Sequence, residues 1–230
     1  MTKKLLVGNA ISEKCLASLE KRGYELTLLP PFSKLQKGVS HHADMLFFYF
    51  GGELLTHIDY YRENREILDR LGVKINTTDE NISHDYPNDI LFNTFLTEDK
   101  ILFAKEKYVS EKIKQFAKTV VDVKQGYTSC STCRVANNAF ITTDSGLFKA
   151  YSKNGIDALL VEKEGIFLQG YNCGFIGGAS VVFDDSVCFF GSLSGYKDGQ
   201  RVREFVEKHG KNVVDLSDEK LTDIGGCIVL

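Results

Sequence analysis

Cysteine, histidine and aspartate residues stand just before several short apolar segments of the chain. His42 and Asp44 lie two residues apart ahead of one such segment, and Cys130 precedes another. A thiolate can attack an electrophilic carbon, a histidine can donate and accept the protons of that step, and carboxylates can hold a cationic substrate. These residue types indicate nucleophilic catalysis if the fold brings them together.

Each of these residues also has an ordinary structural role that the sequence leaves open. His42 can be a surface or capping histidine. Asp44 and Asp89 can cap the starts of hairpins, and Cys130 can be a small buried thiol. Cys227 is an alternative nucleophile because two glycines precede it.

Cys130 and Cys133 have the spacing of a redox motif or of half a zinc site. However, the residues that follow predict a strand where a thioredoxin-like motif needs a helix, and Cys173 alone cannot complete a second ligand pair. We therefore expect neither a metal nor a cofactor. A reversible disulfide between Cys130 and Cys133 remains an alternative role for this segment.

A charged amphipathic stretch, usually closed by a glycine and followed by a short β-branched run, recurs along the chain. Glycine is expected just past the last helical turn, because only glycine enters the left-handed region there without strain. The five copies are spaced roughly 40 to 55 residues apart. They are found at Leu19–Leu26, Leu68–Ile75, Ile113–Val123 (without the glycine), Ser152–Leu159 and Glu207–Val214.

Pairs of short apolar runs joined by turn residues precede most of these helices and predict β-hairpins. Leu5–Val7 and Cys227–Leu230 have no hairpin partner, so we expect the two ends of the chain to pair with each other. The predicted hairpins are Met45–Phe50 with Glu53–Leu55, Ile90–Leu96 with Ile101–Phe103, Arg134–Ala136 with Ala139–Thr142, and Ala179–Phe183 with Val187–Phe190 across Asp184-Asp185.

These patterns predict one α/β domain over residues 1–230, built from about five strand-strand-helix-strand units in a ring that the terminal strands close. A three-layer α/β sandwich is the alternative, but it would place single strands between helices. No Gly-x-Gly-x-x-Gly follows the first strand and no Gly-x4-Gly-Lys-Ser/Thr occurs, so the usual nucleotide-binding loops are absent.

The balance of charges indicates which binding partners to expect, and the cysteines indicate the cellular compartment. The 28 Lys and Arg residues nearly balance the 31 Asp and Glu residues, which argues against a nucleic acid or an anionic membrane as partner. The apolar run at the N-terminus is too short for a signal peptide or a membrane span. The six cysteines are irregularly spaced, which indicates a reducing compartment, so we expect a cytoplasmic protein.

The segments that open the predicted hairpins include His42-Ala43-Asp44, the run from Gln125-Gly126-Tyr127 through Cys133, and the run from Gly174 to Ala179. In these motifs the chain resembles the pentein superfamily of guanidino-group-modifying enzymes, and specifically an uncharacterised bacterial family with that fold. The resemblance covers nearly the whole chain. It implies a five-bladed pentein α/β propeller with a site at the central channel.

His42-Ala43-Asp44 is similar to the His-x-Asp motif of agmatine deiminase-like proteins. The resemblance implies that His42 is the general acid/base and that Asp44 binds the guanidinium. It places the nucleophile two units further round the ring, at Cys130 or, failing that, at Cys133. The residues expected to line the substrate site are Asn88, Asp89, Tyr127, Cys133, Phe175 and Asp223.

The resemblance implies a Cys-dependent hydrolase or transferase acting on a cationic guanidino or amidino small molecule. The alternative is a non-catalytic pentein scaffold that binds a small molecule or a protein or ribosomal partner. Ile224 favours this alternative, because the enzymes have Glu at the matching position before Gly-Gly. We expect neither a nucleic acid nor a membrane as partner, and a homodimer is compatible with the sequence.

Overall fold

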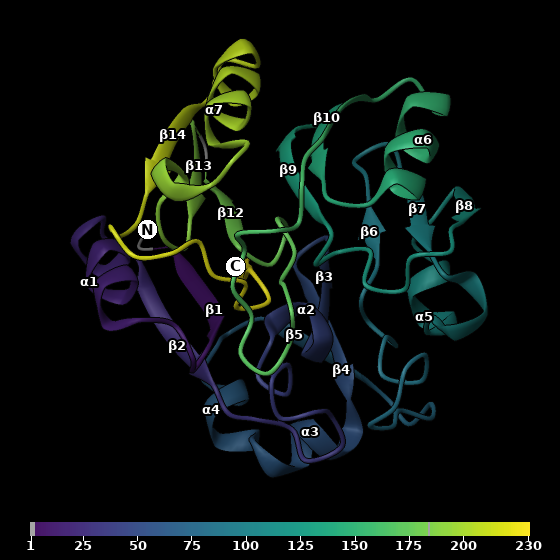
Figure 1. The fold of residues 1–230 in the computed structure, drawn as a ribbon. Coiled ribbons are helices and arrows are strands. Elements are labelled where there is room, and N and C mark those ends of the chain that lie inside the picture. Colours follow the sequence, from purple (N-terminus) through teal and green to yellow (C-terminus); the bar gives the residue numbers. More distant parts are fainter. Residues whose placement is uncertain (1–2, 184) are drawn as a thin grey trace.

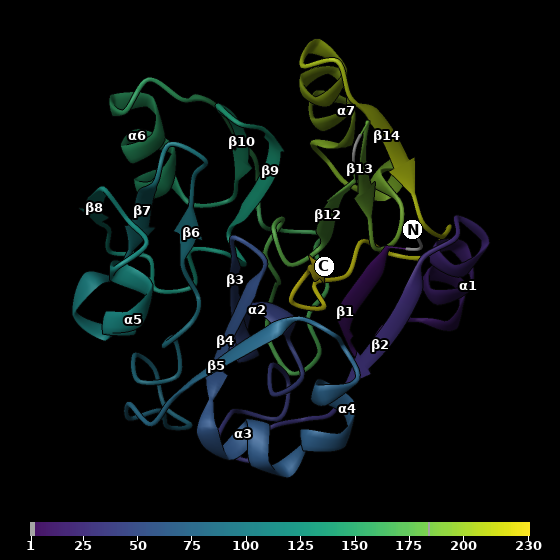
Figure 2. The same cartoon turned by 180° about the vertical axis from the view of Figure 1, so that it is seen from behind.

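The computed structural model describes residues 3–183 and 185–230, and within them the strands form five sheets of three strands each. In every sheet the central strand pairs antiparallel with one neighbour and parallel with the other. Figures 1 and 2 show helices α1 and α3 to α7 at the rim of the molecule and the one-turn helix α2 near its centre.

The elements follow the order of the five sheets along the chain. The first sheet combines β1 (Lys4–Gly8) and β2 (Glu25–Leu29) with the last strand, β15 (Cys227–Val229), and carries α1 (Glu13–Lys21). The second contains β3 (Phe47–Phe50), β4 (Glu53–His57) and β5 (Lys74–Thr78), with α2 (Ala43–Leu46), α3 (Ile58–Glu63) and α4 (Arg65–Asp69).

The other three sheets repeat the same plan. The third contains β6 (Phe95–Leu96), β7 (Ile101–Ala104) and β8 (Thr119–Asp122), with a 3-10 turn at Glu106–Tyr108 and α5 (Glu111–Lys114). The fourth contains β9 (Thr132–Ala136), β10 (Ala139–Thr142) and β11 (Asp157–Leu160), with α6 (Ser145–Lys153). The fifth contains β12 (Ser180–Phe183), β13 (Ser186–Phe189) and β14 (Asn212–Asp215), with a 3-10 turn at Leu193–Gly195 and α7 (Gly199–Lys208).

In four of the helix-to-strand units a glycine follows the helix, as the sequence predicted. Gly23, Gly72, Gly155 and Gly210 have φ angles of +86°, +73°, +75° and +72°. These values lie in the left-handed region, where a side chain would be strained. The predicted positions of the helix ends are confirmed.

Two predicted strands are shorter than the sequence pattern indicates. Of Ile90–Leu96 only Phe95–Leu96 is a strand, because hydrogen bonds from Asn93 N to Ile90 O and from Thr94 N to Phe92 O fold the preceding residues into turns. Met45 belongs to α2 and not to the following strand. A continuous apolar run predicts burial but does not distinguish a buried turn from a strand. Asp184, predicted in a hairpin turn, lies outside the described residues.

The predicted pairing of the chain ends is confirmed. β1 pairs antiparallel with β15, with Leu5 opposite Val229 and Val7 opposite Cys227. The N–H of Leu230 donates to the carbonyl of Lys4 at 2.9 Å. A three-layer sandwich would have one larger sheet, so the five separate sheets of the described chain count against that alternative.

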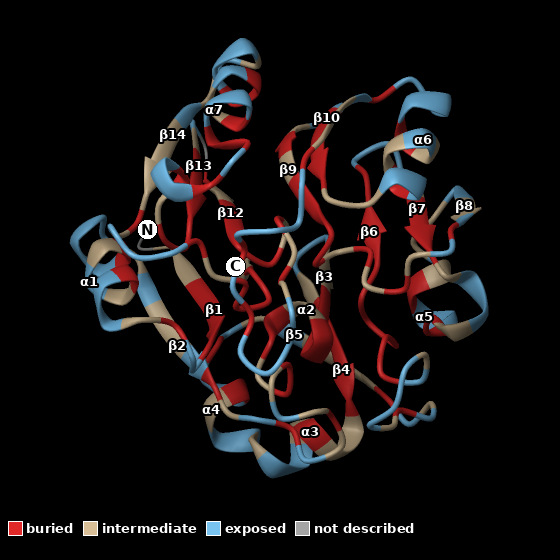
Figure 3. Cartoon of the chain, in the orientation of Figure 1, coloured by how far each residue is buried: buried red, intermediate tan, exposed pale blue. Residues whose placement is uncertain are grey.

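Apolar side chains pack between neighbouring sheets. One cluster joins the first three sheets, and others join the third to the fourth, the fourth to the fifth and the fifth to the first. Figure 3 shows the inner strands as buried and the outer helix faces as exposed. Among the described helices, none has the length and apolar character that crossing a membrane requires.

Deletion of residues 227–230 should destabilise the domain, because it removes β15 and leaves the buried Leu5 and Val7 on an open sheet edge. We expect the melting temperature, followed by circular dichroism, to fall by at least about 5 °C. Deletion of Leu230 alone is the control and should have a smaller effect. An unchanged melting temperature in the longer deletion would show that the pairing contributes little to stability.

Candidate active site

Helix α2 places His42 and Asp44 at the centre of the molecule. His42 is the N-cap residue of this single turn, but its side chain makes no capping hydrogen bond. The ring is 1% exposed. The capping role that the sequence left open for His42 is therefore not the one observed.

Cys130 lies on a turn before β9 and contacts Asp44 across the centre. Its Sγ donates to Asp44 Oδ2 at 2.8 Å, although the two residues are 86 positions apart in the chain. The turn is held by hydrogen bonds from Ser131 N to Tyr127 O and from Thr132 N to Ser129 O. The structure therefore places the predicted nucleophile next to the predicted cation-binding carboxylate.

Asp223 brings a second carboxylate to the same place. Its Oδ1 lies 3.9 Å from His42 Nδ1. The carboxylate accepts hydrogen bonds from Gly225 N at 3.0 Å and from Phe175 N at 2.9 Å. Ile224, by contrast, packs in an apolar cluster. The second carboxylate at the centre therefore comes from Asp223, whereas position 224 contributes an apolar side chain.

Glycines allow the segments to approach this closely. At Gly225, whose φ is +76°, an added Cβ would lie 2.2 Å from Cβ of His42. At Gly178 it would lie 1.9 Å from Oδ1 of Asp223, and at Gly177 it would lie 2.6 Å from the carbonyl oxygen of Cys130. Real Cβ atoms do not come this close. The glycines at these three positions are therefore required for the close packing of the segments.

Asn93 is a member of the site that the sequence analysis missed. Its side-chain amide donates to Cys130 Sγ at 3.1 Å, and its oxygen accepts from Ser129 N at 2.9 Å and Cys130 N at 3.3 Å. Asn93 is fully buried. Asn93 lies within Ile90–Leu96, which was predicted to be a strand. A polar residue in such an apolar run is the signal that could have identified it.

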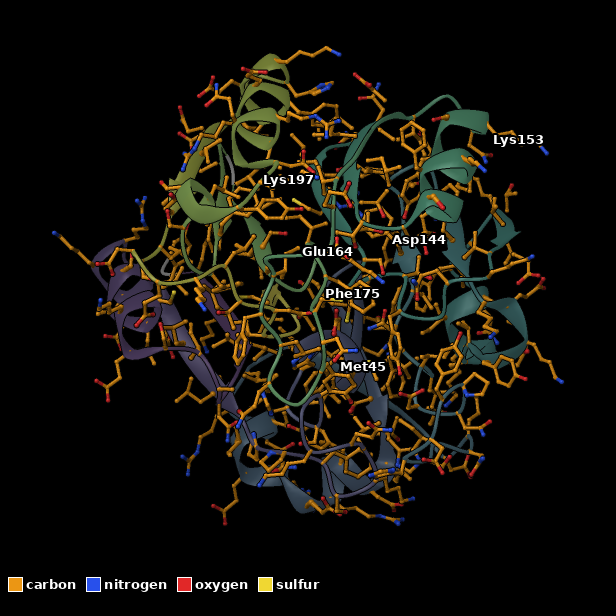
Figure 4. All side chains as sticks on the ribbon, viewed as in Figure 1. Met45, Asp144, Lys153, Glu164, Phe175 and Lys197 are labelled. Carbon is orange, nitrogen blue, oxygen red and sulfur yellow. The ribbon has the colours of Figure 1, made fainter. Side chains whose placement is uncertain are left out.

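Asp89, Tyr127 and Phe175 form a layer beside the cluster. The Tyr127 hydroxyl donates to Asp89 Oδ2 at 2.7 Å, and the rings of Tyr127 and Phe175 are 6.0 Å apart. Figure 4 shows Phe175 and Met45 near the middle of the molecule. Since Phe175 N also binds Asp223, this layer is connected directly to the carboxylates.

Two positions predicted to line the substrate site, Cys133 and Asn88, lie elsewhere. Cys133 packs with Val135 and Ile141 in an apolar cluster, where burial raises the pKa of its thiol to about 12. Side chains at adjacent strand positions point to opposite faces of a sheet, so Cys133 points away from the cavity that Thr132 and Arg134 line. Asn88 is exposed in a turn. Cys227, the alternative nucleophile, lines the same cavity as Asp44. All six cysteines are free, so no disulfide joins Cys130 to Cys133.

Burial disfavours charge on every ionisable group of the cluster. It raises the pKa of Asp44 to about 8 and that of Asp223 to about 7. It lowers the pKa of His42 to about 3, with His41 adding to the effect. Burial, followed by the charge of Asp44, raises the pKa of the Cys130 thiol well above its usual range. A bound cation would reverse this trend by favouring the ionised carboxylates.

Several buried polar atoms of the site have no hydrogen-bond partner in the described chain. They include both ring nitrogens of His42, Oδ1 of Asp44 and Oδ1 of Asp89. In the part of the chain that the structure describes, no lysine or arginine forms an ion pair with Asp44, Asp89 or Asp223. Buried acceptors without donors are costly unless a ligand satisfies them. The site therefore has the character of a receptor for a cation with several N–H groups.

A cavity of about 380 Å³ reaches the site. It runs along β3, β6, β9, β12 and β15, the strands that pair antiparallel with the central strand of each sheet. Its walls include Asp44 and Ser129 near the cluster, and Glu98 and Arg134 further along. Neither His42 nor Cys130 lines it. Asp44 is therefore the member of the cluster that a small molecule in this cavity would contact.

The three side chains of His42, Asp44 and Cys130 could also hold a metal ion. One nitrogen, one carboxylate oxygen and one sulfur lie within 4.8 Å of one another. Zinc accepts this combination of donor atoms.

Comparison with known proteins gives a family and a fold. The model of a family of unknown function, DUF6873, matches residues 6–228. The chain belongs to this family. A search of curated proteins finds no match for this DUF6873 protein.

Solved structures of guanidino-modifying enzymes share the fold of this DUF6873 member. Agmatine deiminase of C. jejuni is 9% identical with a TM-score of 0.59, over 99% of this chain and 92% of that one. DDAH (dimethylarginine dimethylaminohydrolase) from Pseudomonas aeruginosa is 12% identical with a TM-score of 0.55, over 95% and 93%. An amidinotransferase of saxitoxin biosynthesis from Microseira wollei is 10% identical with a TM-score of 0.56, over 94% and 88%. The fold is that of the pentein superfamily, as its sequence resemblance indicated.

Replacement of Asp44 by Asn should change how stability depends on pH. The Asp44 pKa rises from 3.8 to about 8 on folding, so the native state retains a proton that the unfolded state releases. This contribution to stability is present below about pH 4 and is lost as pH rises to about 8. Asn cannot ionise, so melting temperatures should favour the variant increasingly from pH 5 to pH 9, by a few °C or more.

The control for this experiment is Asp99→Asn, which removes an exposed carboxylate in a hairpin turn. Its melting temperature should follow that of the wild type at every pH. If Asp44→Asn differs from the wild type by the same amount at pH 5 and pH 9, the carboxyl group of Asp44 does not titrate in this range.

Proposed function

We propose that this protein is a Cys-dependent hydrolase or transferase acting on a guanidino or amidino small molecule. The observation that carries the proposal is the set of buried polar atoms without partners on His42 and Asp44, next to the thiol of Cys130. A planar guanidinium supplies positive charge and several N–H donors, which are what these atoms lack.

The comparisons support the same class of substrate. The similar structures are, by their names, an agmatine deiminase, a dimethylarginine dimethylaminohydrolase and an amidinotransferase. We also infer that the five sheets are the blades of a closed pentein propeller, because the terminal strands pair and apolar clusters connect each sheet to the next. The free cysteines support a cytoplasmic location.

In the first half of the proposed reaction, the bound cation favours the ionised form of Asp44, which then accepts the thiol proton of Cys130. Asp44 Oδ2 lies 2.8 Å from the sulfur and is the acceptor that this thiol contacts. The sulfur then forms a bond to the guanidinium carbon, the C–N bond to one amine breaks, and Asp44 passes its proton to the departing amine. The product of this half is a cationic thiouronium on Cys130.

In the second half, His42 removes a proton from water. The lowered pKa keeps the ring neutral, so one ring nitrogen has a free lone pair for that proton. The hydroxide adds to the thiouronium carbon, the C–S bond breaks, and the proton on His42 returns to the sulfur. The protonated urea formed in this step passes its hydroxyl proton to the amine product or to water. Hydrolysis thus gives a urea derivative and an amine, whereas an acceptor amine in place of water gives transfer of the amidino group.

The burial of Cys130 favours a second candidate function, a non-catalytic binding scaffold. Cys130 is 3% exposed, and burial raises the pKa of its thiol. A structural thiol has both properties. The two candidates differ in whether a cationic reagent reacts with Cys130.

Labelling with 2-chloroacetamidine and with neutral chloroacetamide tests the proposal directly. We expect Cys130 to react at least about tenfold faster with the cationic reagent between pH 6 and 9, because the carboxylates concentrate the cation beside the sulfur. His42→Ala should lower the rate, since it removes a buried group of the site. Peptide mass spectrometry would identify the labelled cysteine.

The control variant is His84→Ala, because His84 is exposed and lies outside the cluster. It should label as the wild type does. Selective labelling of Cys227 instead would move the nucleophile to that residue. Equal rates with both reagents at every cysteine would favour the binding scaffold.

A further inference from the structure

We infer that Asn93 is a positioning residue that holds the sulfur of Cys130 in place between its own amide and the carboxylate of Asp44. This inference rests on the proposed role of Cys130 as the nucleophile. Asn93 precedes β6 in the third sheet, whereas Cys130 precedes β9 in the fourth. The contact therefore joins two neighbouring sheets at the centre of the molecule.

The hydrogen bonds of the Asn93 oxygen determine which way the amide faces. Oδ1 accepts from two consecutive backbone N–H groups, those of Ser129 and Cys130, at 2.9 and 3.3 Å. A flipped amide would turn its own N–H groups against these donors and lose both bonds. The amide nitrogen must therefore face the sulfur.

The amide nitrogen is surrounded by acceptors from two segments. It lies 3.1 Å from Sγ of Cys130, 3.2 Å from Sδ of Met45 and 3.4 Å from the carbonyl oxygen of Asp44. The sulfur is the nearest of the three. Because Asn93 is fully buried, water does not compete for its N–H groups.

An N–H donor distinguishes between the two protonation states of the thiol. A neutral sulfur is a weak acceptor, whereas a thiolate forms a charge-assisted hydrogen bond that is roughly twice as strong as a neutral one. Asn93 therefore lowers the pKa of Cys130, against the larger effect of burial. Asp44 Oδ2, on the other side of the sulfur, receives the proton that the thiol releases.

The same side chain also fixes the position of the sulfur. Its oxygen holds the backbone of Cys130 while its nitrogen contacts Sγ of that residue. One amide thus restrains Cys130 at two points. A nucleophile held in this way loses less conformational freedom when it attacks a carbon.

The inference is tested by the rate at which iodoacetamide alkylates Cys130, followed by peptide mass spectrometry between pH 7 and 9.5. Asn93→Asp retains an acceptor for the two backbone N–H groups but places an oxygen against the sulfur. Asn93→Ala removes both interactions without adding charge. We expect each variant to lower the Cys130 rate, Asn93→Asp at least about tenfold, because the sulfur loses the N–H group that holds it and, in Asn93→Asp, faces a carboxylate.

Two internal references accompany these rates. Asn137→Asp introduces the same charge at an exposed hairpin turn and should leave the rate unchanged. Cys173, which is partly exposed, should react equally in all variants and reports the activity of the reagent. A purely structural role for Asn93 predicts the opposite sign, because a loosened site would expose Cys130 and raise its rate.

The inference is overturned if Asn93→Ala alkylates Cys130 as fast as or faster than the wild type. It is also overturned if wild-type Cys130 is not alkylated by pH 9.5, because Asn93 would then sustain no thiolate. Iodoacetamide is neutral, so the outcome does not depend on cation recognition. Equal labelling by chloroacetamidine and chloroacetamide would remove the proposed substrate class and leave the role of Asn93 intact.

Discussion

The close approach of chain segments at the centre of the molecule is the constraint on which the site depends. Gly177, Gly178 and Gly225 each lie where a Cβ atom would overlap a neighbouring atom. The space that they leave is occupied by the carbonyls around Cys130, by the carboxylate of Asp223 and by His42. The glycines are thus as necessary to the geometry as the reactive groups themselves.

This packing removes water from groups that prefer to be charged. Asp44 and Asp223 lie in one buried cluster whose described residues provide no lysine or arginine partner. The protein compensates by retaining protons, which is why both carboxyl groups have raised pKa values. A positive charge placed near the two carboxyl groups would favour their ionised forms and lower both pKa values.

The sequence predicted much of the fold but only part of the site. Gly23 and Gly210 mark helix ends because backbone conformation there depends on a single residue. The motif His42-Ala43-Asp44 indicated two of the central groups. The contacts of Asn93 and the exposed position of Asn88 could not be predicted, because both depend on how the segment before β6 folds into turns. Apolar periodicity does not report such turns.

Asp223 illustrates a different limit of sequence reasoning. The sequence predicted that this residue lines the substrate site, but not how its carboxylate is held. In the structure, a left-handed glycine at position 225 and two backbone hydrogen bonds orient the carboxylate of Asp223 toward His42. A motif names the residue but does not report the backbone geometry that orients it.

The pairing of β1 with β15 has a consequence for how the chain folds. Leu5 and Val229 are separated by almost the whole sequence, yet they are opposite each other in one sheet. β2 follows β1 closely in the sequence, whereas the other edge of β1 stays uncovered until residues 227–229 join the sheet. Contacts of such high sequence separation slow folding, and an uncovered strand edge can pair with other chains in that interval. The sheet that begins with β1 therefore keeps an open edge for longer than a sheet whose three strands are close together in the sequence.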